Sequence, residues 1–137
     1  MQTISDLQQL ISEMNPILHP ELWVYCTIEA PDITPELITQ SFALVRESES
    51  ITLITTVEQA ANLGFVDVEP FQRIELQVYS SLEAVGLTAA VSQCLKEHNI
   101  SANVVAAYHH DHILLPKRDA QKALTALLDL TEQKTVR

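Results

Sequence analysis

The chain has 137 residues and a formal net charge of −10, from 18 acidic and 8 basic residues. This length suits one compact core or two small ones, since domains usually run from ~50 to 250 residues. Because phosphate binding needs a basic surface, the acidic balance argues against nucleic acid and anionic membrane surfaces as partners.

The cysteines and the N-terminus both favour a cytoplasmic protein. Cys26 and Cys94 lie far apart in apolar patterns, without the C-x-x-C spacing of metal or redox sites, so we interpret them as reduced core residues. The first residues lack a basic segment followed by an apolar core, as a secretion signal would have. No apolar run approaches the ~20 residues that span a bilayer.

The N-terminal region predicts a helix followed by a central strand. Apolar residues at helical spacing over residues 3–14, with Thr3 and Asp6 placed as a capping pair, predict the helix. The run from Leu22 to Ile28 is rich in β-branched and aromatic residues and lies between two prolines, so it predicts a strand.

The rest of the first half predicts two short helices and three strands. Thr34 before a proline, and Thr56 as the start of a capping box, each indicate where a helix begins, and Gly64 indicates where the second helix ends. A four-residue polar loop separates two strand-like runs, as in a hairpin. In chain order the predicted ranges are 34–39, 41–46, 51–55, 57–63 and 65–68.

The second half repeats this order. Strand 71–79 is followed by a polar turn, a helix that Gly86 opens, two strands and a last helix, with predicted strands at 103–108 and 113–115 and the helix at 119–130. The polar residues 131–137 are a poor candidate for a final strand. We therefore expect an open edge in the second sheet, covered by another strand or by a second subunit.

These residues resemble a known family. Three segments of the second half resemble the sequences of small bacterial ACT-domain proteins: S-L-E-A-V-G-L-T-A-A-V, N-I-S-A-N-V-V and Y-H-H-D-H-I-L-L-P. They are more distantly similar to cytosolic arginine sensors and to aspartate kinase regulatory domains. The resemblance implies an α+β, ferredoxin-like βαββαβ fold in two tandem ACT-like units. We expect residues 1–70 to form the N-terminal unit with its leading helix, and residues 71–137 to form the C-terminal ACT domain.

The turn before the second-half helix is the strongest candidate site. A helix start offers unpaired N–H groups and a partial positive charge, and a glycine lets a ligand approach the backbone. We expect Val85, Gly86 and Leu87 to offer N–H groups to a carboxylate. Ser81 would add a hydroxyl or simply cap the turn.

The resemblance extends this site to the neighbouring strands. It implies that Asn103 binds the ligand through its amide, although the same residue could instead satisfy backbone groups at a strand edge. It also implies that Asp111 accepts a cationic amino group. An acid for the amine and a helix start for the carboxylate together describe an α-amino-acid site.

The sequence leaves other functions open. A metal site at residues 109–112 is disfavoured, since neighbouring side chains on a strand end point to opposite faces. No nucleophile, phosphate-loop or zinc-protease motif indicates an enzyme, and no cofactor is expected. We predict a non-catalytic regulatory protein that binds a small-molecule effector, an amino acid, as a homodimer or higher oligomer. The alternative is an interaction module that keeps the fold without a ligand.

Overall fold

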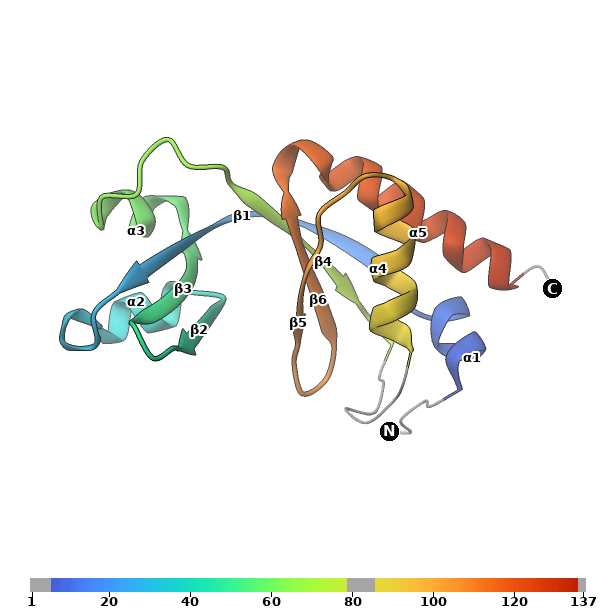
Figure 1. The fold of residues 1–137 in the computed structure, drawn as a ribbon, viewed down its shortest axis with the longest axis horizontal. Helices are drawn as coiled ribbons and strands as arrows, with labels where there is room; N and C mark the ends of the chain where they lie inside the picture. The colour runs from blue at the N-terminus through green and yellow to red at the C-terminus, as the bar shows by residue number, and fades with distance from the viewer. Residues whose placement is uncertain (1–5, 79–85, 136–137) are drawn as a thin grey trace. The chain divides into compact units, whose positions relative to one another are not determined.

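The structure of the protein, a computed structural model, describes residues 6–78 and 86–135 and forms two compact units (Figure 1). The first unit is Glu21–Phe71, and the second combines Met1–Pro20 with Gln72–Arg137. The sequence predicts a division between residues 70 and 71. In the structure the N-terminal segment packs instead with the C-terminal half of the chain.

The first unit confirms the predicted hairpin and both of its helices. Thr34 accepts a hydrogen bond from the Leu37 N–H (3.2 Å), and Thr56 accepts one from the Gln59 N–H (3.1 Å), so each threonine caps its helix as predicted. The elements are the second part of β1 (Pro16–Ile28), η1 (Ala30–Asp32), α2 (Pro35–Gln40), β2 (Ala43–Arg46), β3 (Ile51–Thr56) and α3 (Val57–Asn62).

The predicted closing strand over residues 65–68 is wrong, because this segment is irregular. Gly64 has a φ of 96°, and the Phe65 N–H donates back to the carbonyl of Ala60 (2.9 Å). The Gly64 N–H donates to the carbonyl of Ala61 (3.0 Å). These two bonds form a Schellman motif, which turns the chain over the end of α3.

The second unit contains the N-terminal helix and most of the later elements. They are α1 (Leu7–Ser12), the first part of β1, β4 (Phe71–Leu76), α4 (Leu87–Glu97), β5 (Asn103–Ala106), β6 (Asp111–Pro116), η2 (Lys117–Asp119) and α5 (Ala120–Thr135). Asp6 caps α1, and the predicted partner Thr3 lies outside the described residues. Helix α5 continues five residues beyond its predicted end at residue 130.

Strand β1 covers the edge that the sequence leaves open. The hydrogen-bonded strand order is β2-β3-β1-β4-β6-β5, so β1 lies beside β4. The Gln77 N–H donates to the carbonyl of Met14 (2.8 Å), and the Gln72 side chain donates to the carbonyl of His19 (3.0 Å). The prediction that another strand covers this edge is confirmed, and the strand comes from the N-terminal segment. Pro20 marks the residue at which β1 leaves the second unit.

The core of the second unit lies between its sheet and its helices. Helix α1 contacts both α4 and α5 and buries Leu10 and Ile11. Cys94 is a buried free thiol in this core, and Cys26 is one in the separate core of the first unit, as predicted. The fully buried large side chains of this core are Leu10, Met14, Ile74, Leu76, Val91, Leu95, Ile113, Leu115 and Leu127.

Candidate functional site

Helix α4 begins differently from the three helices before it. Asp6, Thr34 and Thr56 cap their helices with side-chain oxygens, whereas Gly86 caps α4 and has no side chain to offer. The carbonyl of Gly86 accepts the first helical hydrogen bond, from the Ala90 N–H (2.8 Å). Because the cap residue supplies no acceptor, the start of this 11-residue helix is suited to an external anion.

The structure gives two reasons for a glycine at residue 86. Its φ is 105° and its ψ is −20°, a conformation that residues with a Cβ rarely adopt. A Cβ built there would lie 3.1 Å from Cδ2 of Leu7 and 3.4 Å from Cδ1. Helix α1 therefore packs directly against the start of α4.

The side chain of Leu87 is part of the core, with 4 % of its surface exposed. Its contribution to a site would therefore be its backbone N–H, as the sequence predicts. The other two predicted residues of this turn, Ser81 and Val85, lie outside the described residues.

Asp111 begins β6 on the helix side of the sheet. Alternate residues of a strand share a face, and Ile113 and Leu115 belong to the core beneath the helices, so Asp111 faces the same side. In Figure 1 the start of α4 and the turn between β5 and β6 both lie toward the lower edge of the view. Asp111 and the start of α4 thus share one end and one face of the second unit.

Asp111 is half-buried, and this burial raises the pKa of its carboxyl group. The nearby His110 partly offsets that effect. A carboxylate that loses hydration in this way gains from a positively charged partner. An ammonium group beside Asp111 would supply one.

Asn103 lies on the other face of the sheet. It pairs with Leu114 in the antiparallel register of β5 and β6, whereas Asp111 pairs with Ala106. Its side-chain amide donates to the carbonyl of Leu114 (3.2 Å). The structure therefore places Asp111 at the same end and on the same face of the second unit as the start of α4, and it places the Asn103 amide on the opposite face.

A polar network that sequence reasoning missed lies on the face of the sheet away from the helices. Arg73 donates through Nη1 to Oε1 of Glu75 (3.2 Å) and to Nδ1 of His112 (3.1 Å). Nε2 of His19 lies 3.2 Å from the same Glu75 oxygen. Alternation along β4 is the signal that could have grouped Arg73 with Glu75. Their partners come from β1 and β6, and no local pattern predicts those contacts.

This network shifts two pKa values downward. Burial alone would raise the pKa of Glu75, but the hydrogen bond from Arg73 and the neighbouring histidines outweigh it, so the pKa is lowered. Burial lowers the pKa of His112, and the positive charge of Arg73 lowers it further. The lowered pKa values favour the ionised carboxylate of Glu75 and the neutral imidazole of His112. This arrangement is typical of a structural network within a sheet.

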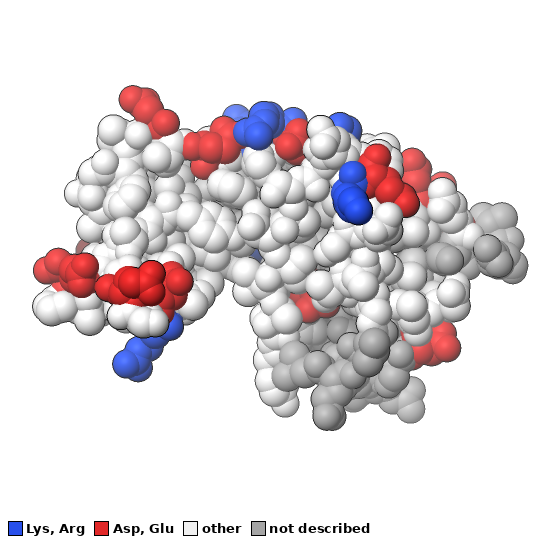
Figure 2. All heavy atoms as spheres, in the orientation of Figure 1, with Lys and Arg blue, Asp and Glu red and all other residues white. Residues whose placement is uncertain are grey.

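The described part of the chain contains neither a cluster of metal ligands nor a membrane-spanning helix. Across residues 6–78 and 86–135, no three His, Cys, Asp or Glu side chains come together in a way that could hold a metal ion. In the same residues, no helix has the length and apolar character required to cross a membrane. On the face drawn in Figure 2, basic side chains lie singly or beside acidic ones and form no continuous basic patch.

Comparison with known families identifies the fold. One ACT-domain family model matches residues 2–72, and a second ACT-domain model matches residues 73–129. The chain belongs to the ACT-domain family. The two matches lie in tandem, which confirms the predicted pair of ACT-like units with a mixed α+β fold. ACT domains are regulatory, ligand-binding modules, so the chain is a module of this kind.

Solved structures give the same fold. A Vibrio cholerae protein of unknown function, described as a possible transport protein, is 40 % identical, with 91 % of this chain and 95 % of that chain covered and a TM-score of 0.79. An Agrobacterium tumefaciens protein is 15 % identical, with coverage of 85 % and 87 % and a TM-score of 0.67.

The fold also matches part of a larger protein. Aspartokinase III of E. coli, solved with aspartate and ADP, is 16 % identical, with 84 % of this chain and 32 % of that chain covered and a TM-score of 0.56. At this identity the likeness shows the fold alone. No curated protein matches the chain.

Proposed function

We propose that the protein is a non-catalytic regulatory module that binds a free α-amino acid at the start of α4. The observation that carries this proposal is the position of Asp111 on the same face and at the same end of the second unit as the helix start at Gly86, which has no side-chain cap. An α-amino acid carries one carboxylate, which complements the helix start, and one ammonium group, which complements the Asp111 carboxylate.

Each group of the ligand has a proposed partner. The carboxylate would accept hydrogen bonds from the backbone N–H groups of Val85, Gly86 and Leu87, with the hydroxyl of Ser81 as a further donor. The ammonium group would donate to Asp111. A hydrogen bond to a charged group contributes ~1.5–3 kcal/mol. Losing the Asp111 charge should therefore weaken binding roughly tenfold to a hundredfold.

Binding would act through the equilibrium of α1 and α4. Leu7 rests against Gly86, so a ligand at the start of α4 would favour the arrangement in which α1 is docked. A regulator converts affinity into a signal when its ligand binds one of two states more tightly. We propose that the two states differ in the docking of α1.

A thermal-shift screen of the twenty amino acids tests the proposal. A ligand at 100 times its dissociation constant stabilises the folded protein by ~2.7 kcal/mol, which for a chain of this size raises the melting temperature by roughly 5–10 °C. The responding amino acid should lose most of this effect in Asp111→Asn. The matched control is Asp67→Asn, an exposed position in the first unit whose positive φ of 56° asparagine also tolerates.

The variant Asn103→Ala separates the two faces of the sheet. We expect it to leave the ligand response unchanged, because its amide is turned away from Asp111. A flat screen with all twenty amino acids would contradict the proposal and leave the alternative, an interaction module without a ligand, as the better account. A response that survives in Asp111→Asn would contradict the assigned role of that carboxylate.

We also propose that the protein forms a homodimer or a higher oligomer. Strand β5 is the last in the strand order, so its outer edge is available for pairing with a second copy. Sedimentation equilibrium at micromolar concentration tests this proposal. A strictly monomeric protein, with and without the responding amino acid, would contradict it.

A further inference from the structure

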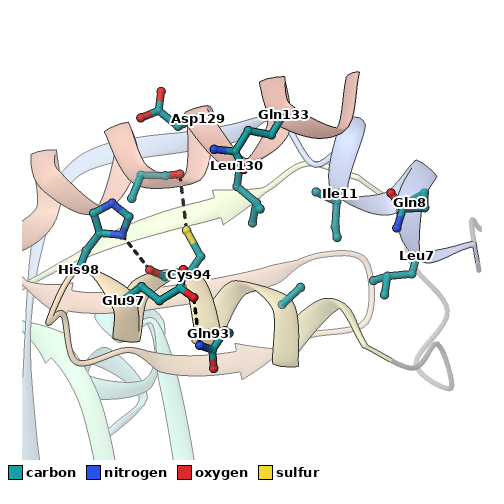
Figure 3. Close-up of a pocket in the computed structure, with 12 residues that line it drawn as sticks. Leu7, Gln8, Ile11, Gln93, Cys94, Glu97, His98, Asp129, Leu130 and Gln133 are labelled. Atoms are coloured by element: carbon teal, nitrogen blue, oxygen red, sulfur yellow. Dashed lines mark hydrogen bonds between the residues drawn. The ribbon is translucent and has the colours of Figure 1, made fainter. Parts of the chain in front are cut away.

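A hollow in the second unit lies between α1, α4 and α5, and its lining residues Leu7 and Ala90 bring one end of it near the start of α4 (Figure 3). It is partly open to solvent and has a volume of about 350 Å³. This volume is at the lower end of the range of small-molecule sites, which is ~300–1,000 Å³. Its lining residues are Leu7, Gln8, Ile11, Ala90, Gln93, Cys94, Glu97, His98, Ala126, Asp129, Leu130 and Gln133, and we call it the helix groove.

The floor of the helix groove is apolar. Ile11, Cys94 and Ala126 are buried there, and Leu7 and Leu130 are partly buried against the same core. Figure 3 shows Ile11 and Leu130 pointing toward the space between the helices. The Cys94 thiol donates to the carbonyl of Ala126 (3.5 Å), which fixes the sulfur in the floor. A ligand would therefore bury an apolar body here.

The rim of the helix groove is acidic. Glu97 stands on the α4 side and Asp129 on the α5 side, and the described residues that line the groove include neither lysine nor arginine. Burial raises the pKa of the Cys94 thiol, and the carboxylates of Glu97 and Asp129 raise it further. The negative charges of Glu97 and Asp129 therefore act on the thiol at the floor of the groove.

The remaining polar groups on the rim leave this negative charge in place. The amide of Gln93 donates to Oε2 of Glu97 (3.1 Å), which orients the carboxylate without neutralising it. His98 is engaged through Nδ1 with the carbonyl of Cys94 (2.8 Å). A bound molecule with a positive charge would complement the rim, whereas a molecule with a carboxylate would be repelled.

We propose that the helix groove binds a small organic cation, an ammonium group carried on an apolar body. The apolar body would pack on Ile11, Ala126 and Leu130, and the ammonium group would lie between Glu97 and Asp129. This ligand class differs from the zwitterionic effector proposed for the start of α4, because it lacks the carboxylate that the helix start would bind. The two proposals therefore succeed or fail separately.

Three probes of equal length test the charge preference by NMR titration of the full chain: hexylammonium, 1-hexanol and hexanoate. We expect hexylammonium to bind saturably and roughly tenfold more tightly than 1-hexanol, with hexanoate weakest, because two exposed ion pairs contribute ~0.2–1 kcal/mol each. The double variant Glu97→Gln/Asp129→Asn should remove this preference. Equal affinity for hexylammonium and hexanol, or an unchanged preference in the double variant, would overturn the proposal.

A steric pair tests the location. Ala90 lines the helix groove and is partly buried, whereas its neighbour Ala89 on the same helix is exposed and does not line it. Ala90→Phe should abolish hexylammonium binding, and Ala89→Phe should leave it unchanged. Binding that persists in a folded Ala90→Phe protein would overturn the assignment to this groove. If Ala90→Phe fails to fold, the Glu97→Gln/Asp129→Asn variant tests the location instead, because both side chains are exposed and their replacement should leave the fold intact.

Discussion

Replacing Gly86 with alanine probes the contact between α1 and the start of α4. The chain has two glycines, and both have positive φ, 105° at Gly86 and 96° at Gly64. A Cβ at Gly86 would meet the side chain of Leu7 at 3.1 Å, whereas a Cβ at Gly64 would meet nothing within 4 Å. Gly64→Ala is therefore a matched control for the backbone effect alone.

The expected magnitude follows from two contributions. Holding alanine at positive φ costs ~1–2 kcal/mol at either position, and the smaller entropy of the unfolded alanine chain offsets part of this cost equally in both. At Gly86 the partly buried side chain of Leu7 must also move by a few tenths of an ångström or leave its preferred rotamer. This adjustment costs a further ~0.5–1.5 kcal/mol of folding stability. We expect Gly86→Ala to destabilise by about 1–3 kcal/mol and Gly64→Ala by about 0.5–1.5 kcal/mol.

The assay is urea unfolding followed by far-UV circular dichroism, in a double-mutant cycle with Leu7→Ala. In the Leu7→Ala background the cost of Gly86→Ala should fall to that of Gly64→Ala, because the shortened side chain removes the close contact. Gly64→Ala and Leu7→Ala should be additive. The reasoning is refuted if Gly86→Ala costs no more than Gly64→Ala, or if Leu7→Ala leaves its cost unchanged.

Three further predictions follow from the described contacts. Because folding lowers the pKa values of Glu75 and His112, the unfolded chain binds more protons at these two groups below their ordinary values of 4.5 and 6.5, so their contribution to the melting temperature should fall as pH is lowered from 7.5 to 3. The raised pKa of Asp111 acts in the opposite direction, and Asp111→Asn removes that contribution. Glu75→Gln should flatten the lower part of that profile, and an equally steep profile would contradict this. Thr56→Ala should lower the free energy of unfolding in urea by ~1 kcal/mol, because the α3 cap is lost. The control Thr39→Ala, within α2, should cost little. Equal costs for the two variants would argue against the cap. Leu10→Ala should cost ~2–5 kcal/mol, because α1 belongs to the core of the second unit, and a cost below 1 kcal/mol would contradict that packing.

The local parts of the fold were predictable from the sequence. Thr34 and Thr56 cap their helices, the polar loop after β2 makes a hairpin, and Gly86 opens α4. Each of these features depends on a few neighbouring residues, whose backbone preferences and hydrogen bonds act within one or two turns of chain. The repeated order of such features indicated two similar units, and the resemblance of the second half to ACT-domain proteins indicated which fold they have.

The long-range pairing was beyond the sequence patterns. Pro20 suggested that the first strand begins after it, at Leu22, yet β1 starts at Pro16 and completes the sheet of the second unit before it enters the first. A proline lacks an N–H but can occupy a strand position whose N–H is not needed for pairing. Which distant strand β1 would meet depends on tertiary packing.

The candidate site was predictable only where it depends on local sequence. Gly86 and Asp111 belong to motifs whose local geometry the sequence indicates, and the alternation of β6 gives Asp111 its face. The Arg73–Glu75 pair, in contrast, gains its partners from β1 and β6. The helix groove is formed by three helices that are remote in sequence, and its acidic rim appears only when α4 and α5 are packed together.

The most direct test of the proposed function uses the two glycines as internal reporters. A sample labelled with [15N]glycine should give two amide signals, Gly86 at the proposed site and Gly64 in the first unit. On titration with the amino acid that responds in the melting screen, or with each of the twenty if none responds, we predict a saturable shift of the Gly86 signal and a stationary Gly64 signal. If neither signal moves with any amino acid, or if Gly64 moves as far as Gly86, amino-acid binding at the start of α4 is contradicted.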